Sequence, residues 1–293
     1  SHSDIRISND ILKQLSEVYR KIRNTARYIL GNLYDFNPDT DSVADDQLHE
    51  LDRWALARMD EVAKECNEGY EEFDFHQVYH AIHNFCTIDL SNFYLDIIKD
   101  RLYVEKPDSV SRRAAQTAIY RILRDMTLVF APILAFTCEE IWANLPKSKD
   151  HNPEACVLNE MPKGKAGDET AEFMAKWERI RKIRDEVNKA LENARNQKTI
   201  GKSLEAQVTL KADGELYDFL KENEAVLEPV FIVSKVVLEQ GAVAQTTAET
   251  EGLEVTVSKA HGEKCERCWA YSDTVGKDEK HPTLCARCAA IIG

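Results

Sequence analysis

Four of the chain's eight cysteines form two closely spaced pairs. The first pair is CERC at residues 265–268, and sixteen residues separate it from CARC at residues 285–288. This spacing lets two turns present two thiolates each to one tetrahedral metal ion, and a ribbon of about thirty residues needs such a metal because its core is too small. We predict one structural zinc ion; iron is an alternative that spacing does not exclude, and two disulfides would not suit a reducing cytosol. The predicted ligands are Cys265, Cys268, Cys285 and Cys288.

Residues beside these cysteines could contact nucleic acid. Trp269 directly follows the second cysteine, and a ribbon built around a metal has little room to bury an indole. The indole therefore either packs on the neighbouring part of the chain or stacks on a base. Arg267 and Arg287 occupy matching positions in the two cysteine pairs and could donate hydrogen bonds to phosphate.

A glycine-lysine-serine sequence raises the possibility of a nucleotide site. It ends the stretch NQKTIGKSL at residues 196–204, but Asn196 stands where a phosphate-binding loop has its first glycine. Such a loop also follows a strand and begins a helix, whereas the flanking sequence here predicts a helix before it and a strand after it. We interpret the stretch as a helix C-terminus, with Gly201 supplying the turn into the strand.

A further candidate is an arginine-rich face on the first predicted helix. Arg20, Arg23 and Arg27 align at i, i+3 and i+7, and Gly31 lies one turn further, where a backbone could approach. This face could contact RNA phosphates, although an ordinary solvated helix face is the alternative. The apolar positions expected to form the buried face of the same helix are Leu15, Val18, Tyr19, Ile22, Ala26, Ile29 and Leu33.

The charge is unevenly distributed along the chain. The 38 basic and 51 acidic residues give a net charge of −13, yet residues 176–202 carry nine basic groups against four acidic ones. Residues 35–52 instead carry seven carboxylates and no lysine or arginine. Such segregation fits a polyanion bound at a defined place. No apolar run approaches the roughly 18 to 20 residues of a membrane span, so we expect a cytosolic protein with no membrane partner and no DNA partner.

The elements that position these residues are predicted to be mainly helical. Apolar spacing predicts helices over about 9–33, 47–69, 74–102 and 109–130, and TCEE predicts a fifth helix with Thr137 as its N-cap. Short links between them favour a helical bundle.

A change of pattern follows the bundle. A long basic helix over about 169–197 precedes a strand near 204–212, a short helix, and strands near 230–239 and 253–260. We therefore predict a mainly α fold, in which a helical bundle is followed by a small α+β unit and a C-terminal four-cysteine zinc ribbon. The expected domains are residues 1–163, 164–258 and 259–293.

Six motifs resemble, in order, the C-terminal third of bacterial isoleucyl-tRNA synthetases. They are KIRNTARYILGNLYDF, LDRWAL, FYLDIIKDRLY, APILAFTCEEIW, GKSLEA and EKCERCW…LCARC. The helical motifs alone would indicate the class I synthetases for large aliphatic amino acids, and the four-cysteine ribbon narrows the resemblance to the isoleucine enzyme.

The resemblance implies a tRNA-binding fragment. In that family the bundle docks on the anticodon stem-loop and the zinc ribbon helps to grip the tRNA, so Trp269 would take the place of an aromatic at that interface. The face formed by Arg20, Arg23 and Arg27 is a separate candidate, based on periodicity.

The family's catalytic motifs are missing from this sequence. The His-x-Gly-His turn, the Lys-Met-Ser-Lys-Ser loop that binds ATP and the inserted editing domain do not occur in it, and its opening residues look like a start within a longer protein. We expect a monomer that binds isoleucine tRNA and activates no amino acid. A free-standing zinc-ribbon adaptor with a helical scaffold is the alternative.

Overall fold

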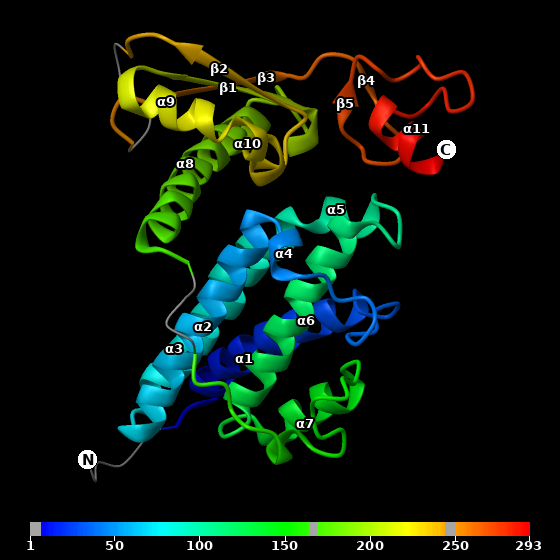
Figure 1. The fold of residues 1–293 in the computed structure, drawn as a ribbon. Helices are drawn as coiled ribbons and strands as arrows, with labels where there is room; N and C mark the ends of the chain where they lie inside the picture. Colours follow the sequence, from blue (N-terminus) through cyan, green and yellow to red (C-terminus); the bar gives the residue numbers. More distant parts are fainter. Residues whose placement is uncertain (1–6, 165–168, 244–249) are drawn as a thin grey trace. The chain divides into compact units, whose positions relative to one another are not determined.

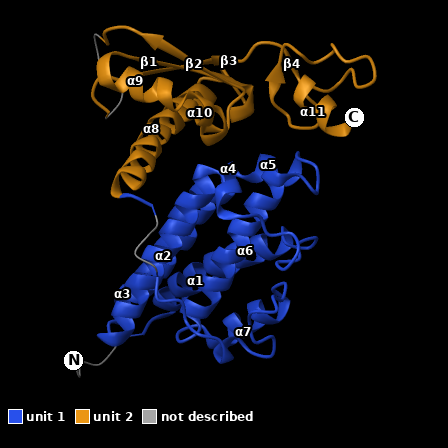
Figure 2. Cartoon of the chain, viewed as in Figure 1, with its two compact units in different colours: residues 1–170 blue, residues 171–293 orange. Residues whose placement is uncertain are grey.

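The chain forms two compact units. The structure is a computed structural model that describes residues 7–164, 169–243 and 250–293. Contacts divide the chain into residues 1–170 and residues 171–293 (Figure 2). The first unit is a bundle of helices, and the second combines helices with a small sheet and a cysteine-rich ribbon (Figure 1). The predicted fold class is thus confirmed.

Two further expectations concern the ends of these units. The first six residues, where we expected a start within a longer protein, lie outside the described residues. The boundary between an α+β domain and a separate ribbon domain stays a prediction.

No helix within the described ranges is both long enough and apolar enough to cross a bilayer.

The first unit is built around one deeply buried helix, α6. Fifteen of its 21 residues are buried, as expected for a helix with partners on most sides. It packs against α2, which also packs against α3. The helices of this unit, in chain order, are α1 (Asn9–Gly31), α2 (Glu50–Glu71), α3 (Phe75–Asn84), α4 (Leu95–Ile97), α5 (Lys99–Tyr103), α6 (Val110–Phe130) and α7 (Ala135–Asn144).

Helix α1 is buried only along its second half. The Ser8 side chain caps it by accepting a hydrogen bond from the Ile11 amide at 3.2 Å. Ile22 and Ile29 are buried as expected, but Leu15 and Tyr19 are exposed, so that part of the predicted buried face is wrong. Periodicity identifies the apolar face of a helix but does not show that a partner lies against every turn of it.

The predicted single helix over 74–102 is interrupted by a π-helix, Phe85–Tyr94, between α3 and α4. Two buried carboxylates hold this region by pairing with arginines. Asp89 Oδ2 accepts a hydrogen bond from Arg58 Nη2 at 3.0 Å. Both carboxylate oxygens of Asp52 accept from Arg101, at 2.8 and 2.7 Å, and Tyr94 also donates to Asp52 at 2.8 Å. Buried charges require such partners, and sequence periodicity does not reveal these long-range pairs.

Thr137 is not the N-cap of α7, because the helix begins two residues earlier at Ala135. The hydroxyl of Thr137 instead shares a 2.9 Å hydrogen bond with the hydroxyl of Tyr19 on α1. The carboxylate of Glu139 accepts hydrogen bonds from the amides of Cys156 and Val157. The TCEE sequence therefore makes tertiary contacts, which a local capping pattern does not distinguish from a cap.

The second unit places a long helix against a three-stranded sheet. Strand β1 lies in the centre, parallel to β2 and antiparallel to β3, and its residues alternate between buried and half-buried. The predicted strand near 230–239 begins only at Lys235, because Ile232 adopts a left-handed conformation (φ 57°) and ends α10. The elements are α8 (Ala171–Asn196), β1 (Ala206–Ala212), α9 (Gly214–Glu222), α10 (Glu224–Phe231), β2 (Lys235–Gln240), β3 (Glu254–Lys259), β4 (Glu263–Lys264), β5 (Tyr271–Ser272) and α11 (Ala286–Ile292).

The ribbon, comprising β4, β5 and α11, is joined to this sheet by specific hydrogen bonds. The amide of Tyr271 donates to Ser234 Oγ at 2.7 Å, next to the start of β2. The amide of Ala260 donates to the carbonyl of Glu205 at 2.8 Å, just before β1. These bonds fix the position of the cysteine-rich turns relative to the edge of the sheet.

Candidate metal centre and nucleic-acid interface

The four predicted zinc ligands converge in the ribbon. The sulfur atoms of Cys265, Cys268, Cys285 and Cys288 all lie within 4.8 Å of one another. The sulfur atoms of Cys268 and Cys285 are 3.8 Å apart, the separation expected when two thiolates bind a tetrahedral zinc at about 2.3 Å. Four thiolates complete the coordination, so the ligand set fits one structural zinc ion and leaves no open position for catalysis.

Backbone amides prepare one of these thiols to bind as a thiolate. Burial opposes ionisation of Cys265, but hydrogen bonds from the backbone of Cys268, Cys285 and Arg267 lower its pKa to about 6. One of these donors is the Cys285 amide, 3.3 Å from the Cys265 sulfur. Donors directed at sulfur favour the charged form, which is the form that binds metal.

The tight turns of the ribbon depend on unusual backbone conformations. Gly262 has a φ of 87°, and a Cβ there would lie 2.2 Å from the carbonyl carbon of Ser272. Only glycine fits this close approach of two backbones. Trp269 also has a positive φ, 65°, and its amide donates to the carbonyl of Cys265 at 2.9 Å. The turn that contains the first two cysteines therefore fixes the position of the Trp269 backbone, from which the indole extends.

The indole of Trp269 lies at the surface beside two lysines. Its side chain is 57% exposed. Lys264 Nζ and Lys202 Nζ lie 5.6 and 5.8 Å from the ring centroid, within the range of cation–π contacts. Of the two arginines predicted beside it, Arg267 is half-buried and Arg287 is exposed. An aromatic face flanked by cations can stack on a base and attract the adjoining phosphates.

The stretch containing Gly-Lys-Ser does not have the geometry of a nucleotide-binding loop. It follows helix α8 and precedes strand β1, which is the reverse of the order that a phosphate loop requires. The sequence predicts that Gly201 makes this turn, but the residue with the left-handed backbone conformation is Lys198 (φ 59°). The Gly201 amide instead donates to the carboxylate of Glu205 at 2.8 Å. The Glu205 carboxylate thus accepts the hydrogen bond of the Gly201 amide, which in a phosphate-binding loop would be directed at a phosphate.

The three arginines predicted on α1 are all exposed, but they differ in their contacts. Arg23 Nη2 lies 2.9 Å from the carboxylate of Glu140 on α7, and both side chains remain more than half exposed. In the described part of the chain, no carboxylate pairs with Arg20 or Arg27. An exposed ion pair contributes little to stability, about 0–1 kcal/mol, so Arg23 can exchange its partner easily.

A hollow at the C-terminal end of α1 was not foreseen from the sequence. It has a volume of about 580 Å³, and its lining includes Arg27, Gly31 and Tyr34. Tyr103 on α5 and Arg112 on α6 contribute from elsewhere in the sequence. No local pattern could have indicated it, because the hollow forms only where these separate helices meet.

Known proteins share both halves of this arrangement. The family model of the anticodon-binding domain of tRNA ligase matches residues 52–210, and that of the zinc finger found in FPG and IleRS matches residues 262–291. The isoleucine–tRNA ligase of Caldanaerobacter subterraneus subsp. tengcongensis is 49% identical over 294 residues, which is 99% of this chain and 31% of that protein. The isoleucine–tRNA ligase of Syntrophotalea carbinolica is 50% identical, with the same two coverages.

The fold and the site together define a helical-bundle protein with a four-thiolate zinc finger. The first family model matches more than half of the chain, so the chain belongs to the family of the anticodon-binding domain of tRNA ligases. The second covers all four cysteines. The chain spans about 31% of the length of the curated relatives described above.

Proposed function

We propose that this chain is the tRNA-binding portion of an isoleucine–tRNA ligase. In this proposal the bundle recognises the anticodon stem-loop of isoleucine tRNA, and the zinc ribbon adds contacts through Trp269, Arg267 and Arg287. The observation that carries the proposal is the occurrence, in one chain and in this order, of an anticodon-binding match and a zinc-finger match. The exposed face of Arg20, Arg23 and Arg27 is the proposed site for phosphate contacts on the bundle.

The activity itself would belong to a larger protein. We propose that the parent enzyme works in the cytoplasm as a monomer and uses ATP to attach isoleucine to its tRNA. This chain alone is then expected to show no exchange between ATP and pyrophosphate in the presence of isoleucine. That expectation follows from the sequence, in which both nucleotide-binding motifs are missing.

The test is a binding measurement with the zinc-loaded 293-residue chain. We expect it to bind transcribed isoleucine tRNA more tightly than a tRNA with an unrelated anticodon, as judged by filter binding at fixed salt. Trp269→Ala should weaken this binding by roughly 1–3 kcal/mol, the range for one lost base–aromatic stack. Equal, weak binding of both tRNAs would instead favour a zinc-ribbon adaptor whose partner is a protein.

A further inference from the structure

Two histidines lie side by side on the exposed face of α3. His76 and His80 are both exposed, and their separation of four residues places them on adjacent turns of one helix face. Their Nε2 atoms are 3.1 Å apart, and their ring centroids are 4.3 Å apart. At this distance the two nitrogens can share one proton, and a metal ion that binds imidazole nitrogen can take the place of that proton.

The distance between the two nitrogens matches that between two ligands of one metal ion. Zinc binds imidazole nitrogen at about 2.0–2.1 Å, so two nitrogens that subtend an angle of about 90–109° at the ion lie about 2.9–3.3 Å apart. The observed separation of 3.1 Å falls within this range. The pair can therefore bind an ion without a change of side-chain conformation.

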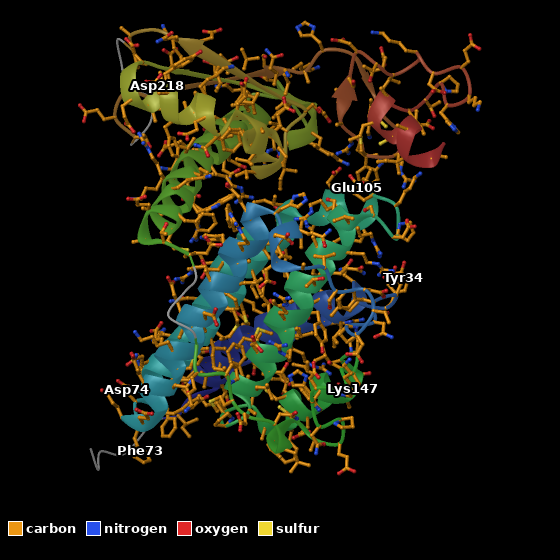
Figure 3. The ribbon with its side chains drawn as sticks, in the orientation of Figure 1. Tyr34, Phe73, Asp74, Glu105, Lys147 and Asp218 are labelled. Carbon is orange, nitrogen blue, oxygen red and sulfur yellow. The ribbon has the colours of Figure 1, made fainter. Side chains whose placement is uncertain are left out.

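The packing of α3 holds the pair in this geometry. Its other face is buried through Val78, Ala81 and Ile82. The carboxylate of Asp74 caps the first turn by accepting a hydrogen bond from the Gln77 amide at 3.2 Å, and Figure 3 labels Asp74 at the beginning of the helix. Because the backbone is already ordered, binding of an ion has to immobilise only two side chains.

The surrounding sequence favours a cation at this place. Residues 65–98 contain seven carboxylates and no lysine or arginine. Two of these carboxylates, those of Glu71 and Glu72, are exposed at the end of α2, just before α3. A local excess of negative charge attracts metal ions and repels phosphate. The histidine pair is thus suited to a different ligand from the arginine face of α1.

The pair supplies only part of a coordination sphere. Among the described residues, the four cysteines alone bring three or more possible metal ligands together. His83, the next histidine on α3, stacks on Tyr79 and has a buried Nε2, so it does not complete the pair. An ion bound by His76 and His80 keeps its remaining positions for water or for a donor from another molecule.

We propose that His76 and His80 form a second metal site, which binds one divalent transition-metal ion of the kind that favours imidazole, such as Ni²⁺, Cu²⁺ or Zn²⁺, through their Nε2 atoms. The inference is independent of tRNA binding. The pair lies in the first unit, whereas the cysteine site lies in the second. Two imidazoles hold an ion less tightly than four thiolates, so the pair should lose its ion on dialysis and fill again when free metal is supplied.

The experiment uses nickel as the probe, because elemental analysis distinguishes it from the zinc of the cysteine site. The zinc-loaded chain is brought to equilibrium with increasing Ni²⁺ by dialysis, and both metals are then measured. We expect one nickel per chain in addition to the retained zinc, and His76→Ala and His80→Ala should each lose that nickel. Nickel should also raise the melting temperature of the wild-type chain only, since the pair exists only in the folded helix.

A spacing control keeps the number of histidines constant. In Gln77→His combined with His80→Ala, the two histidines are adjacent in sequence and do not face each other on a helix, so this variant should bind nickel no better than His80→Ala. His261→Ala removes an exposed histidine of the second unit and should keep the full nickel equivalent. Alanine favours helix, so the helical circular dichroism of the single variants should be unchanged.

Three results would overturn the proposal. Nickel retained in both His76→Ala and His80→Ala would place the ion elsewhere. Loss of zinc in proportion to the nickel bound would place it at the cysteines. Binding by the spacing control as tight as that of the wild-type chain would show that the geometry of the pair is irrelevant.

Discussion

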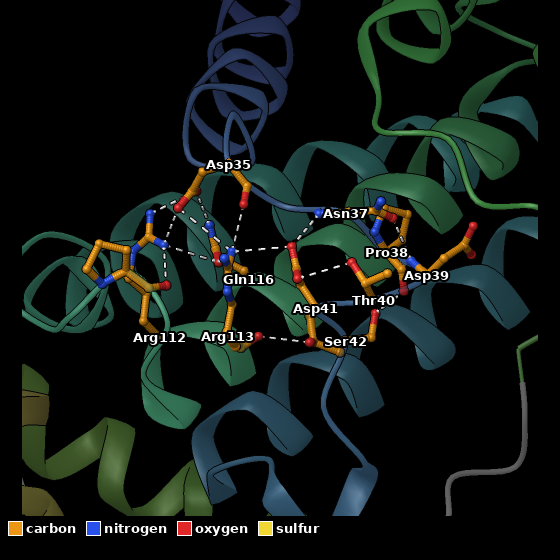
Figure 4. Close-up of polar contacts among 12 residues, drawn as sticks. Asp35, Asn37, Pro38, Asp39, Thr40, Asp41, Ser42, Arg112, Arg113 and Gln116 are labelled. Atoms are coloured by element: carbon orange, nitrogen blue, oxygen red, sulfur yellow. Dashed lines mark hydrogen bonds and ion pairs between the residues drawn. The ribbon is translucent and has the colours of Figure 1, made fainter.

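The Asp35 carboxylate links the segment after α1 to helix α6 (Figure 4). Burial alone would raise the pKa of Asp35, but hydrogen bonds and charge from Arg112 and Gln116 outweigh that effect and leave the pKa below its ordinary value. A carboxyl group whose pKa is lowered by folding contributes stability that is present above its unfolded pKa of about 4. This contribution is lost as the pH falls through the lower, folded-state pKa.

Replacement of this carboxylate should therefore have an effect that depends on pH. Asp35→Asn leaves the Arg112 side chain, which is 6% exposed, without its anionic partner, and we expect the free energy of unfolding at pH 7 to fall by about 3–5 kcal/mol. Near pH 3 the difference from wild type should be smaller, as measured by urea unfolding. Asp45→Asn is the control, because Asp45 is 77% exposed and its pair with Arg121 should contribute under about 1 kcal/mol. A loss of equal size at both pH values would contradict this account.

The sequence revealed some of these residues more readily than others. The zinc ligands were predictable because two short spacings within one ribbon determine their geometry. Tyr34 and Tyr103 were not predictable, because the hollow forms where α5 meets the end of α1. Tyr103 contacts Tyr28 there although it lies 75 residues further along the chain. The exposure of Arg20, Arg23 and Arg27 followed from periodicity, but the pairing of Arg23 with Glu140 is a tertiary contact that no local pattern contains.

At the level of elements, the close packing of α2 against α3 depends on Gly69. A Cβ at this position would lie 2.7 Å from Val78 Cγ2 and 3.1 Å from the carbonyl oxygen of Asp74. The carbonyl belongs to the backbone and cannot move freely, so Gly69→Ala should lower the free energy of unfolding by about 1–3 kcal/mol. Gly31→Ala on α1 is the matched control: it has open space around it and should be neutral or stabilising by up to about 1 kcal/mol. Thermal unfolding of both variants checks this, and an unchanged Gly69→Ala melting temperature would refute the packing argument.

The arrangement of elements was more predictable than their ends. Apolar periodicity gave α1, α2, α6 and α8 within a few residues because each helix buries a continuous face. It failed for residues 85–94, where the pattern stays helical although the backbone widens into a π-helix. It also failed at the start of β2, because the β-branched residues Val230 and Ile232 favour a strand locally while their packing places them at the end of α10.

On the scale of the whole molecule, the zinc should stabilise the ribbon without being required by the bundle, which has its own core. We expect one zinc per chain by elemental analysis, and less than half an equivalent in Cys285→Ser. Cys66→Ser, which alters a fully buried thiol in the bundle, should keep the full equivalent. Chelation should change the tryptophan fluorescence through Trp269, because Trp269 is exposed and the other three tryptophans are at most 2% exposed. Most of the helical circular dichroism should remain. Loss of most helical signal on chelation would mean that the two units fold as one.

The charge distribution of the whole chain leads to a final prediction. A protein of net charge −13 should be repelled by RNA, yet exposed cations on α1 and beside Trp269 give it local positive surfaces. If these contact phosphates, tRNA affinity should fall steeply with salt, because each neutralised phosphate releases counterions. Arg27→Ala should reduce the log–log slope by up to about one unit.

The control for this prediction is Lys64→Ala on α2, which removes one exposed cation outside the proposed interface. It should leave both the slope and the affinity nearly unchanged. Both substitutions make the net charge of the chain more negative by one unit. Binding of tRNA measured at several salt concentrations therefore distinguishes a specific contact from a general change in net charge. Equal effects of the two substitutions would mean that the tRNA responds to the overall field of the protein and that the arginine face of α1 is not its binding site.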